Sequence, residues 1–92
     1  MKIVRAVISG KVQGVWFRAW TIEEAAKRDL RGWVRNRKDG SVEALFAGDP
    51  ARVDAMLAAC RKGPPLAKVE NVESHEADGE KIPDGFDQRR TA

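Results

Sequence analysis

The chain has 92 residues, of which 42% are hydrophobic and 34% are charged, a balance that excludes a disordered or fibrous protein and is typical of one folded domain. No apolar run reaches the roughly 18 residues of a membrane span, and residues 1–5 lack the apolar stretch of a secretory signal. The single cysteine cannot form an internal disulfide. We therefore expect one domain over residues 1–92, located in the cytoplasm and without contact to a membrane.

Charge is unevenly distributed along the chain, although the formal net charge is only +3. Residues 1–40 carry ten Lys and Arg against four acidic residues, whereas residues 41–92 carry seven against ten. The positive first part favours an anionic ligand near it. Charge alone does not distinguish a phosphate compound from a nucleic acid.

The first two predicted elements are a strand at residues 2–9 and a helix at residues 18–30. Alternation places Val4, Ala6 and Ile8 on one face of the strand, which we expect to point at the core. In the helix, apolar residues recur at helical spacing and predict a buried stripe made of Ala19, Ile22, Ala26 and Leu30.

The junction between these elements, residues 10–18, reads Gly-Lys-Val-Gln-Gly-Val-Trp-Phe-Arg and contains almost nothing that could cap a helix. The first backbone N–H groups of a helix have no partner within it and carry partial positive charge, so they can bind an oxyanion. Arg18 would add a guanidinium that matches phosphate oxygens. A simple turn whose amides bind water fits the same residues equally well.

Residues 32–48 form a predicted hairpin around the Asp-Gly pair at residues 39–40. A two-residue turn would scatter the apolar residues over both faces, so we expect a three-residue loop that includes Lys38. This register puts Arg35 opposite Glu43 on the outer face. It also places Asn36 on the face covered by the helices, near the open end of its strand.

Residues 49–62 form the second predicted helix, with Asp49 as N-cap and Pro50 as first residue, and with a stop at the Gly-Pro-Pro of residues 63–65. Cys60 lies on its apolar face. Because that face also carries Val53, Met56 and Leu57, we interpret Cys60 as a packing residue and not as a nucleophile.

Residues 66–76 have the composition of another strand, but Val69 and Val72 are out of phase, which predicts a bulge near Glu70 or Asn71. Residues 77–85 form a predicted polar loop, and residues 86–90 either form a short edge strand or trail away. The order of elements favours an α+β fold of the ferredoxin-like split βαβ type, with two helices on one face of a mostly antiparallel sheet.

Three motifs coincide with one family. They are GxVQGVxFR at residues 10–18, GWVRNxxDGxVE at residues 32–43, and Gly-Pro-Pro followed by Ala-x-Val at residues 63–69. On these motifs the chain resembles the prokaryote-type acylphosphatase family over nearly its whole length. It departs from the family pattern at Asp29 and Leu30, where Leu-Gly-Leu is common, and at Gln88, which takes a usually apolar position.

The resemblance implies hydrolysis of acyl phosphates to a carboxylate and inorganic phosphate, without a metal, a cofactor or a covalent intermediate. It implies that Arg18 binds the phosphate group and that Asn36 holds the attacking water. It also implies that loop backbone amides cradle the phosphate, and these are the amides of Gln13, Gly14, Val15, Trp16, Phe17 and Arg18.

Elementary chemistry agrees with these roles. The carboxylate that leaves an acyl phosphate has a conjugate-acid pKa of roughly 4 to 5, so it departs without a general acid. Phosphoryl transfer then requires in-line positioning and stabilisation of charge on the equatorial oxygens. The Asn36 amide is no base near neutral pH, but it can orient a water whose proton passes to the substrate phosphate.

Two other functions fit parts of the sequence. The aromatic residues at 16, 17, 20 and 33 suggest base stacking, but the strand signature of RNA-recognition domains is missing. The nearer alternative is a phosphate-binding module that serves assembly or regulation. We expect a small-molecule acyl phosphate as substrate, inorganic phosphate or sulfate as competing anions, no nucleic acid partner, and a monomer. His75 stands alone in an acidic strand end and is expected at the surface.

Overall fold

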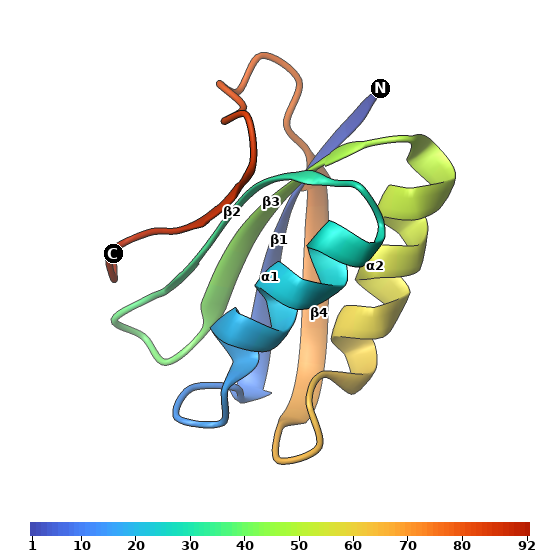
Figure 1. Ribbon diagram of the computed structural model, residues 1–92. Coiled ribbons are helices and arrows are strands. Elements are labelled where there is room, and N and C mark those ends of the chain that lie inside the picture. Colours follow the sequence, from blue (N-terminus) through green and yellow to red (C-terminus); the bar gives the residue numbers. More distant parts are fainter.

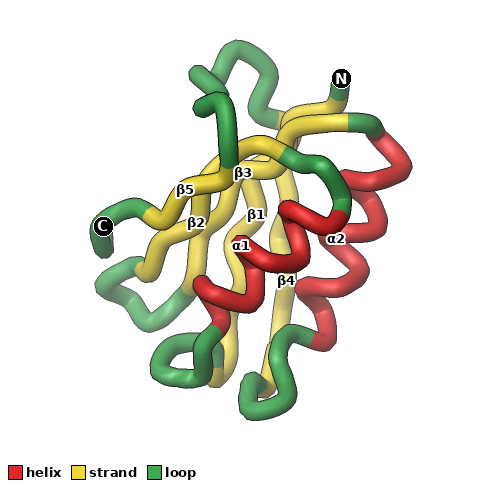
Figure 2. Tube along the Cα trace, viewed as in Figure 1, coloured by secondary structure: helices red, strands yellow, loops and turns green.

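One five-stranded sheet, in the strand order β4-β1-β3-β2-β5, carries both helices on one face (Figures 1 and 2). The computed structural model describes all 92 residues. Along the chain the elements are β1 (Lys2–Lys11), α1 (Phe17–Lys27), β2 (Arg31–Asn36), β3 (Val42–Gly48), α2 (Pro50–Lys62), β4 (Lys68–Glu76) and β5 (Phe86–Gln88). The predicted ferredoxin-like α+β sandwich is confirmed. Neither helix has the length and hydropathy that crossing a bilayer requires.

The end of the chain forms the short edge strand that was one of its two predicted outcomes. All other neighbouring strands are antiparallel, but β5 runs parallel to β2 and pairs Gln88 with Val34. The chain then continues along the same edge. The Arg89 N–H donates to Val34 O at 2.8 Å, and the Ala92 N–H donates to Asn36 O at 3.0 Å.

The β2–β3 hairpin has the predicted register. Asn36 pairs with Val42, and the Arg37 N–H donates to Ser41 O at 2.8 Å. Residues 38–40 therefore form a three-residue loop. This register leaves Asn36 half-buried at the last position of β2, beside the hairpin loop.

The outer face of the hairpin carries the predicted ion pair, because Arg35 Nη2 and Nε each lie 2.7 Å from Glu43 Oε1. The centroid of the Trp33 ring lies 4.8 Å from Arg35 Cζ and 4.9 Å from Arg89 Cζ, so two guanidinium groups contact this ring. With only 3% of its surface exposed, Trp33 serves packing and has no free face for a nucleic acid base.

β4 contains the predicted bulge. Its register with β1 shifts between Ser9 and Gly10, which leaves Glu70 without a partner on β1. Gly10 has φ +120°, and a Cβ at this position would collide with the carbonyl oxygen of Lys68. Only glycine allows the two strands to approach this closely.

The predicted buried stripe of α1 is correct only at Ile22, which packs against the core, and at Leu30, which is buried in it. The residues that α1 buries are Phe17, Thr21 and Ala25, whereas Ala19 and Ala26 are exposed. The Thr21 hydroxyl donates to Phe17 O at 2.8 Å, so this polar side chain fits the core without an unsatisfied group. Apolar periodicity does not detect such a residue.

The predicted end of α1 is also wrong, because the helix stops at Lys27 and not at Leu30. Asp29 adopts the left-handed conformation with φ +54°. The Leu30 N–H donates to Ala25 O at 3.0 Å and the Asp29 N–H donates to Ala26 O at 3.1 Å. This is a Schellman motif, in which the left-handed residue turns the chain out of the helix.

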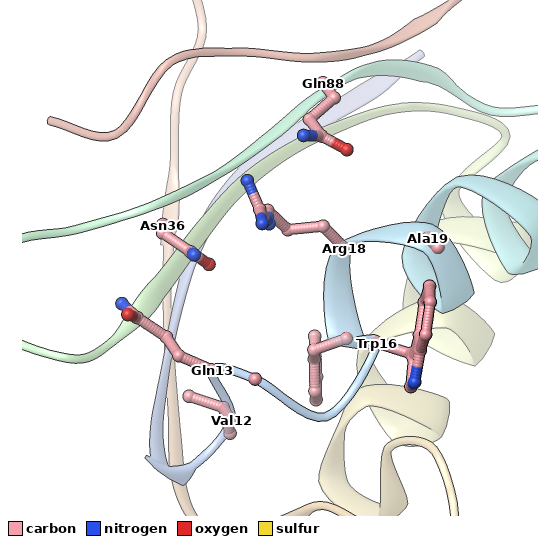
Figure 3. Close-up of a pocket in the computed structure, with 9 residues that line it drawn as sticks. Val12, Gln13, Trp16, Arg18, Ala19, Asn36 and Gln88 are labelled. Atoms are coloured by element: carbon pink, nitrogen blue, oxygen red, sulfur yellow. The ribbon is translucent and has the colours of Figure 1, made fainter.

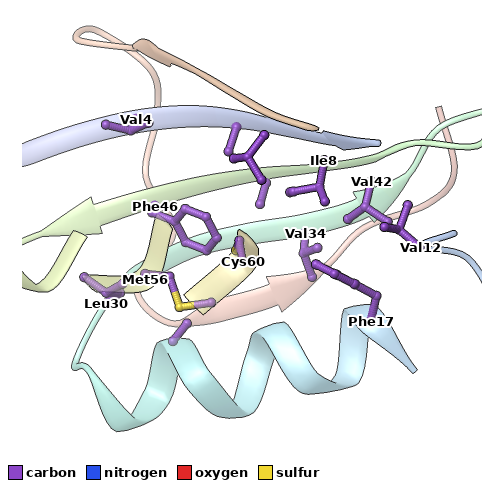
Figure 4. Close-up of a cluster of buried hydrophobic side chains, with 14 of the residues drawn as sticks. Val4, Ile8, Val12, Phe17, Leu30, Val34, Val42, Phe46, Met56 and Cys60 are labelled. Atoms are coloured by element: carbon purple, nitrogen blue, oxygen red, sulfur yellow. The ribbon is translucent and has the colours of Figure 1, made fainter. Parts of the chain in front are cut away.

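α2 begins and packs as predicted. Asp49 Oδ1 accepts hydrogen bonds from the N–H groups of Ala51 (2.9 Å) and Arg52 (3.4 Å), and Pro50 is the first helical residue. Cys60 is fully buried in a core of 16 residues that fills the space between the sheet and the two helices (Figure 4).

Candidate active site

A pocket of about 380 Å³ opens where the loop after β1 and the first turn of α1 face the ends of β2 and β5 (Figure 3). The residues that line it are Val12, Gln13, Gly14, Trp16, Phe17, Arg18, Ala19, Asn36 and Gln88. They include every predicted site residue except Val15, which is buried in the core. No acidic side chain lines the pocket, so its only formal charge is the guanidinium of Arg18.

The loop of residues 12–16 leads into α1 through two residues in the left-handed conformation, Gly14 (φ +73°) and Trp16 (φ +67°). No side chain caps the helix, and its first turn holds no acidic residue. The backbone N–H groups of residues 13–18 donate to no acceptor within the protein. These donors and the positive end of the helix dipole are therefore free to bind an anion.

Arg18 and Asn36 reach the pocket from different elements. Arg18 lies in the first turn of α1 and Asn36 at the last position of β2, and their side chains extend into the same space (Figure 3). None of the ion pairs or side-chain hydrogen bonds of the protein involves either side chain. A cation and a carboxamide that converge without internal partners can bind an oxyanion and a water.

The side chain of Gln13 has a role that sequence reasoning missed. Its Nε2 donates to Arg37 O at 2.8 Å and to Ser41 O at 2.9 Å, so it ties the loop of residues 12–16 to the open end of the hairpin. Asn36 directly precedes one of these two acceptors. The partners lie 24 and 28 residues away, and no local pattern marks such a contact.

Gln88 is the second pocket residue that sequence reasoning missed. Parallel pairing of β5 with β2 sets Gln88 opposite Val34, and its side chain points toward Arg18 from the far side of the pocket (Figure 3). A signal was present, because a polar residue stood in a position that is apolar in the family resembled.

Other reactive side chains lie elsewhere. Cys60 is in the core, where burial raises the pKa of its thiol to about 12. His75 is exposed on β4, as expected, beside a second and more open hollow that also contains Arg5 and three acidic residues. No three His, Cys, Asp or Glu side chains come together in a group that could hold a metal ion.

The sequence and the fold match one family. The acylphosphatase family model matches residues 4–88. An acylphosphatase of Rhizorhabdus wittichii is 50% identical over 91 residues, which cover 98% of this chain and 91% of that protein. An acylphosphatase of Rhodospirillum rubrum is 61% identical over 72 residues, which cover 78% of this chain and 79% of that protein. The crystal structure of acylphosphatase from Bacillus subtilis has a TM-score of 0.92 and 36% identity, and the match covers 97% of this chain and 99% of that one. This chain is therefore an enzyme of the acylphosphatase family.

Proposed function

We propose that this protein hydrolyses acyl phosphates to a carboxylate and inorganic phosphate, and that it uses no metal ion and no cofactor. One observation carries the proposal. The free N–H groups of residues 13–18, the guanidinium of Arg18 and the carboxamide of Asn36 surround one pocket that no acidic side chain lines. A doubly charged phosphoryl group is the ligand that best matches such a set of donors.

The loop and Arg18 bind the phosphoryl group in this proposal. Charge in the transition state is spread over the three equatorial oxygens, and donors already aimed at these oxygens stabilise it. Because the loop N–H groups and the guanidinium have no internal partners, no protein hydrogen bond has to break before they bind. The first turn of α1 holds Arg18 beside the loop amides.

Asn36 orients the water that attacks phosphorus. Its carbonyl oxygen accepts one hydrogen bond from the water, while the new P–O bond forms opposite the bond to the acyl oxygen. The P–O bond to the acyl group breaks, and the carboxylate leaves with the electron pair. The water proton passes to an oxygen of the phosphate, so the reaction needs no general base from the protein.

Hydrolysis of benzoyl phosphate by the unmodified protein, Arg18→Ala and Asn36→Ala tests these roles. We expect Arg18→Ala to raise KM by about ten- to hundredfold, because it removes a charge-assisted contact worth about 1.5–3 kcal/mol. We expect Asn36→Ala to lower kcat by roughly a hundredfold with little change in KM, because it removes a group needed for attack and not for binding. Inorganic phosphate and sulfate should inhibit the unmodified protein competitively and Arg18→Ala more weakly.

Arg61→Ala and Asn71→Ala are matched controls, since both residues are exposed and lie outside the pocket. Both should behave as the unmodified protein does. If the unmodified protein hydrolyses benzoyl phosphate no faster than buffer, the proposed function is wrong. If kcat fell and KM rose by the same factors in both site variants, the division of roles between Arg18 and Asn36 would be wrong.

A further inference from the structure

We propose that Trp16 forms a subsite for the acyl group and makes the enzyme favour acyl phosphates whose acyl group is flat and apolar, such as an aromatic one. This subsite rests on the proposed function and concerns the half of the substrate that the phosphate-binding groups do not contact. When the phosphoryl group lies on the loop amides, the acyl group must point out of the pocket toward its rim.

The rim is apolar on the side of α1. Trp16 is 77% exposed and borders the pocket together with Ala19, which is also exposed. Figure 3 shows Trp16 and Ala19 on one side of the pocket and Gln13 and Asn36 on the other, with the Arg18 side chain extending from α1 toward Asn36. Trp16 and Ala19 thus give the rim an apolar part beside the polar groups, and an acyl phosphate likewise joins an apolar group to a charged one.

Packing does not explain a tryptophan at this position. The other two tryptophans are used inside the protein. Trp20 packs edge-on against Phe17 with ring centroids 5.2 Å apart, and Trp33 is buried and contacts two guanidinium groups. Trp16 has no such partner and presents its ring to solvent at the mouth of the pocket. A free aromatic face of this kind is suited to stacking on a flat apolar group.

The backbone conformation of Trp16 is a second argument that this residue contacts a ligand. Its φ of +67° lies in the left-handed region, which glycine adopts freely and which large side chains disfavour. The only other non-glycine residue with positive φ is Asp29, a residue type that tolerates this conformation better. A strained and exposed aromatic residue beside a pocket is the kind of outlier that marks contact with a ligand.

The test compares benzoyl phosphate with acetyl phosphate in the unmodified protein, Trp16→Gly and Trp16→Phe. Glycine keeps the backbone N–H and fits the left-handed conformation, while phenylalanine keeps an aromatic ring. We expect Trp16→Gly to lower the ratio of kcat/KM for benzoyl phosphate to that for acetyl phosphate by five- to tenfold, and Trp16→Phe to keep this ratio within twofold. Because both substrates share the phosphoryl group, damage to phosphate binding cancels in the ratio.

A binding measurement separates this subsite from the proposed function. Calorimetric titration with benzylphosphonate and methylphosphonate, which are not hydrolysed, should show tighter binding of benzylphosphonate to the unmodified protein and loss of most of this difference in Trp16→Gly. If both phosphonates bind equally to the unmodified protein, or if Trp16→Gly leaves both ratios unchanged, the acyl subsite is wrong. Absence of hydrolysis together with a Trp16-dependent preference for benzylphosphonate would overturn the proposed function alone.

Discussion

Among the single residues around the pocket, Gln13 has the most unusual position. Its side-chain amide bridges the loop before α1 and the hairpin that ends β2, through hydrogen bonds of 2.8 and 2.9 Å to Arg37 O and Ser41 O. The loop offers the backbone N–H groups, and β2 offers Asn36. The distance between these two groups therefore depends on a side chain that need not touch the substrate.

Gln13→Met removes both hydrogen bonds while keeping a side chain of similar length. We expect kcat for benzoyl phosphate to fall ten- to hundredfold, because a shift of about 1 Å between reacting groups has effects of this size. In the Asn36→Ala background the same substitution should change kcat less than twofold, since no positioned carboxamide remains to be misplaced. The measurement is a double-mutant cycle on kcat.

The two backgrounds decide between positioning and general stability. A loss of kcat of equal size with and without Asn36 would show that Gln13 stabilises the loop and does not position Asn36. Chemical denaturation of each variant at the assay temperature confirms that the folded fraction is the same.

Among the secondary-structure elements, features that depend on residues close together in the sequence were predicted from local signals. The Asp-Gly turn and the alternation of apolar residues predicted the hairpin register, and the phase slip predicted a bulge near Glu70 or Asn71. The absence of capping residues before α1 predicted that no side chain would cap its first N–H groups. Each of these features follows from a few consecutive residues.

Features that depend on distant parts of the chain were not predicted. Ala19 and Ala26 were wrongly placed in the buried stripe of α1 because alanines fit either side of a helix. Thr21 was missed because it becomes an acceptable core residue only through its hydrogen bond to Phe17 O. Parallel pairing of β5 with β2 and the side-chain contacts of Gln13 join residues far apart in sequence. The sequence therefore predicted most of the residues that line the pocket, but not the contacts of Gln13 that join the loop to the hairpin.

The end of α1 supports a prediction about stability. Asp29 occupies the left-handed position of the Schellman motif, where glycine is the usual residue. Its side chain is 91% exposed and makes only a 3.5 Å contact with Arg52. Asp29→Gly is expected to raise the free energy of unfolding by about 1 kcal/mol, because relief of backbone strain exceeds the loss of this surface contact.

Asp29→Ala is the control for this substitution. It removes the same carboxylate but retains a Cβ in the left-handed region, so it should not stabilise the protein. Urea denaturation of the three proteins measures the differences. Equal stability of the glycine and alanine variants would show that strain at Asp29 is negligible.

Cys60 lies in the single core of the protein, so its thiol becomes exposed to solvent when the whole protein unfolds. Burial raises the pKa of this thiol from its ordinary value of 9.0 to about 12. Between these values the unfolded chain releases a proton that the folded protein retains. The contribution of this thiol to the free energy of unfolding is therefore fully present below about pH 9, and it is lost as the pH rises from about 9 toward 12.

This linkage predicts a loss of about 1.4 kcal/mol in the free energy of unfolding between pH 8 and pH 10, in addition to any change from other groups. Cys60→Ala lacks the thiol and provides the reference, although its cavity makes it less stable at every pH. The expected result is that the stability difference between the two proteins shrinks by this amount over the interval. A difference that stays constant with pH would show that the thiol is not protected from solvent.

The two edges of the sheet, β4 and β5, differ in how much unpaired backbone they offer to another molecule. β5 and the residues after it run along β2, whereas β4 presents nine residues with one row of unpaired backbone groups. Seven of these nine residues are exposed, three of them are glutamates, and the bulge interrupts the row. A second copy that extended the sheet here would bring carboxylates side by side and meet a twisted edge. The β4 edge, which has the most exposed backbone, therefore hinders the growth of fibrils by strand addition.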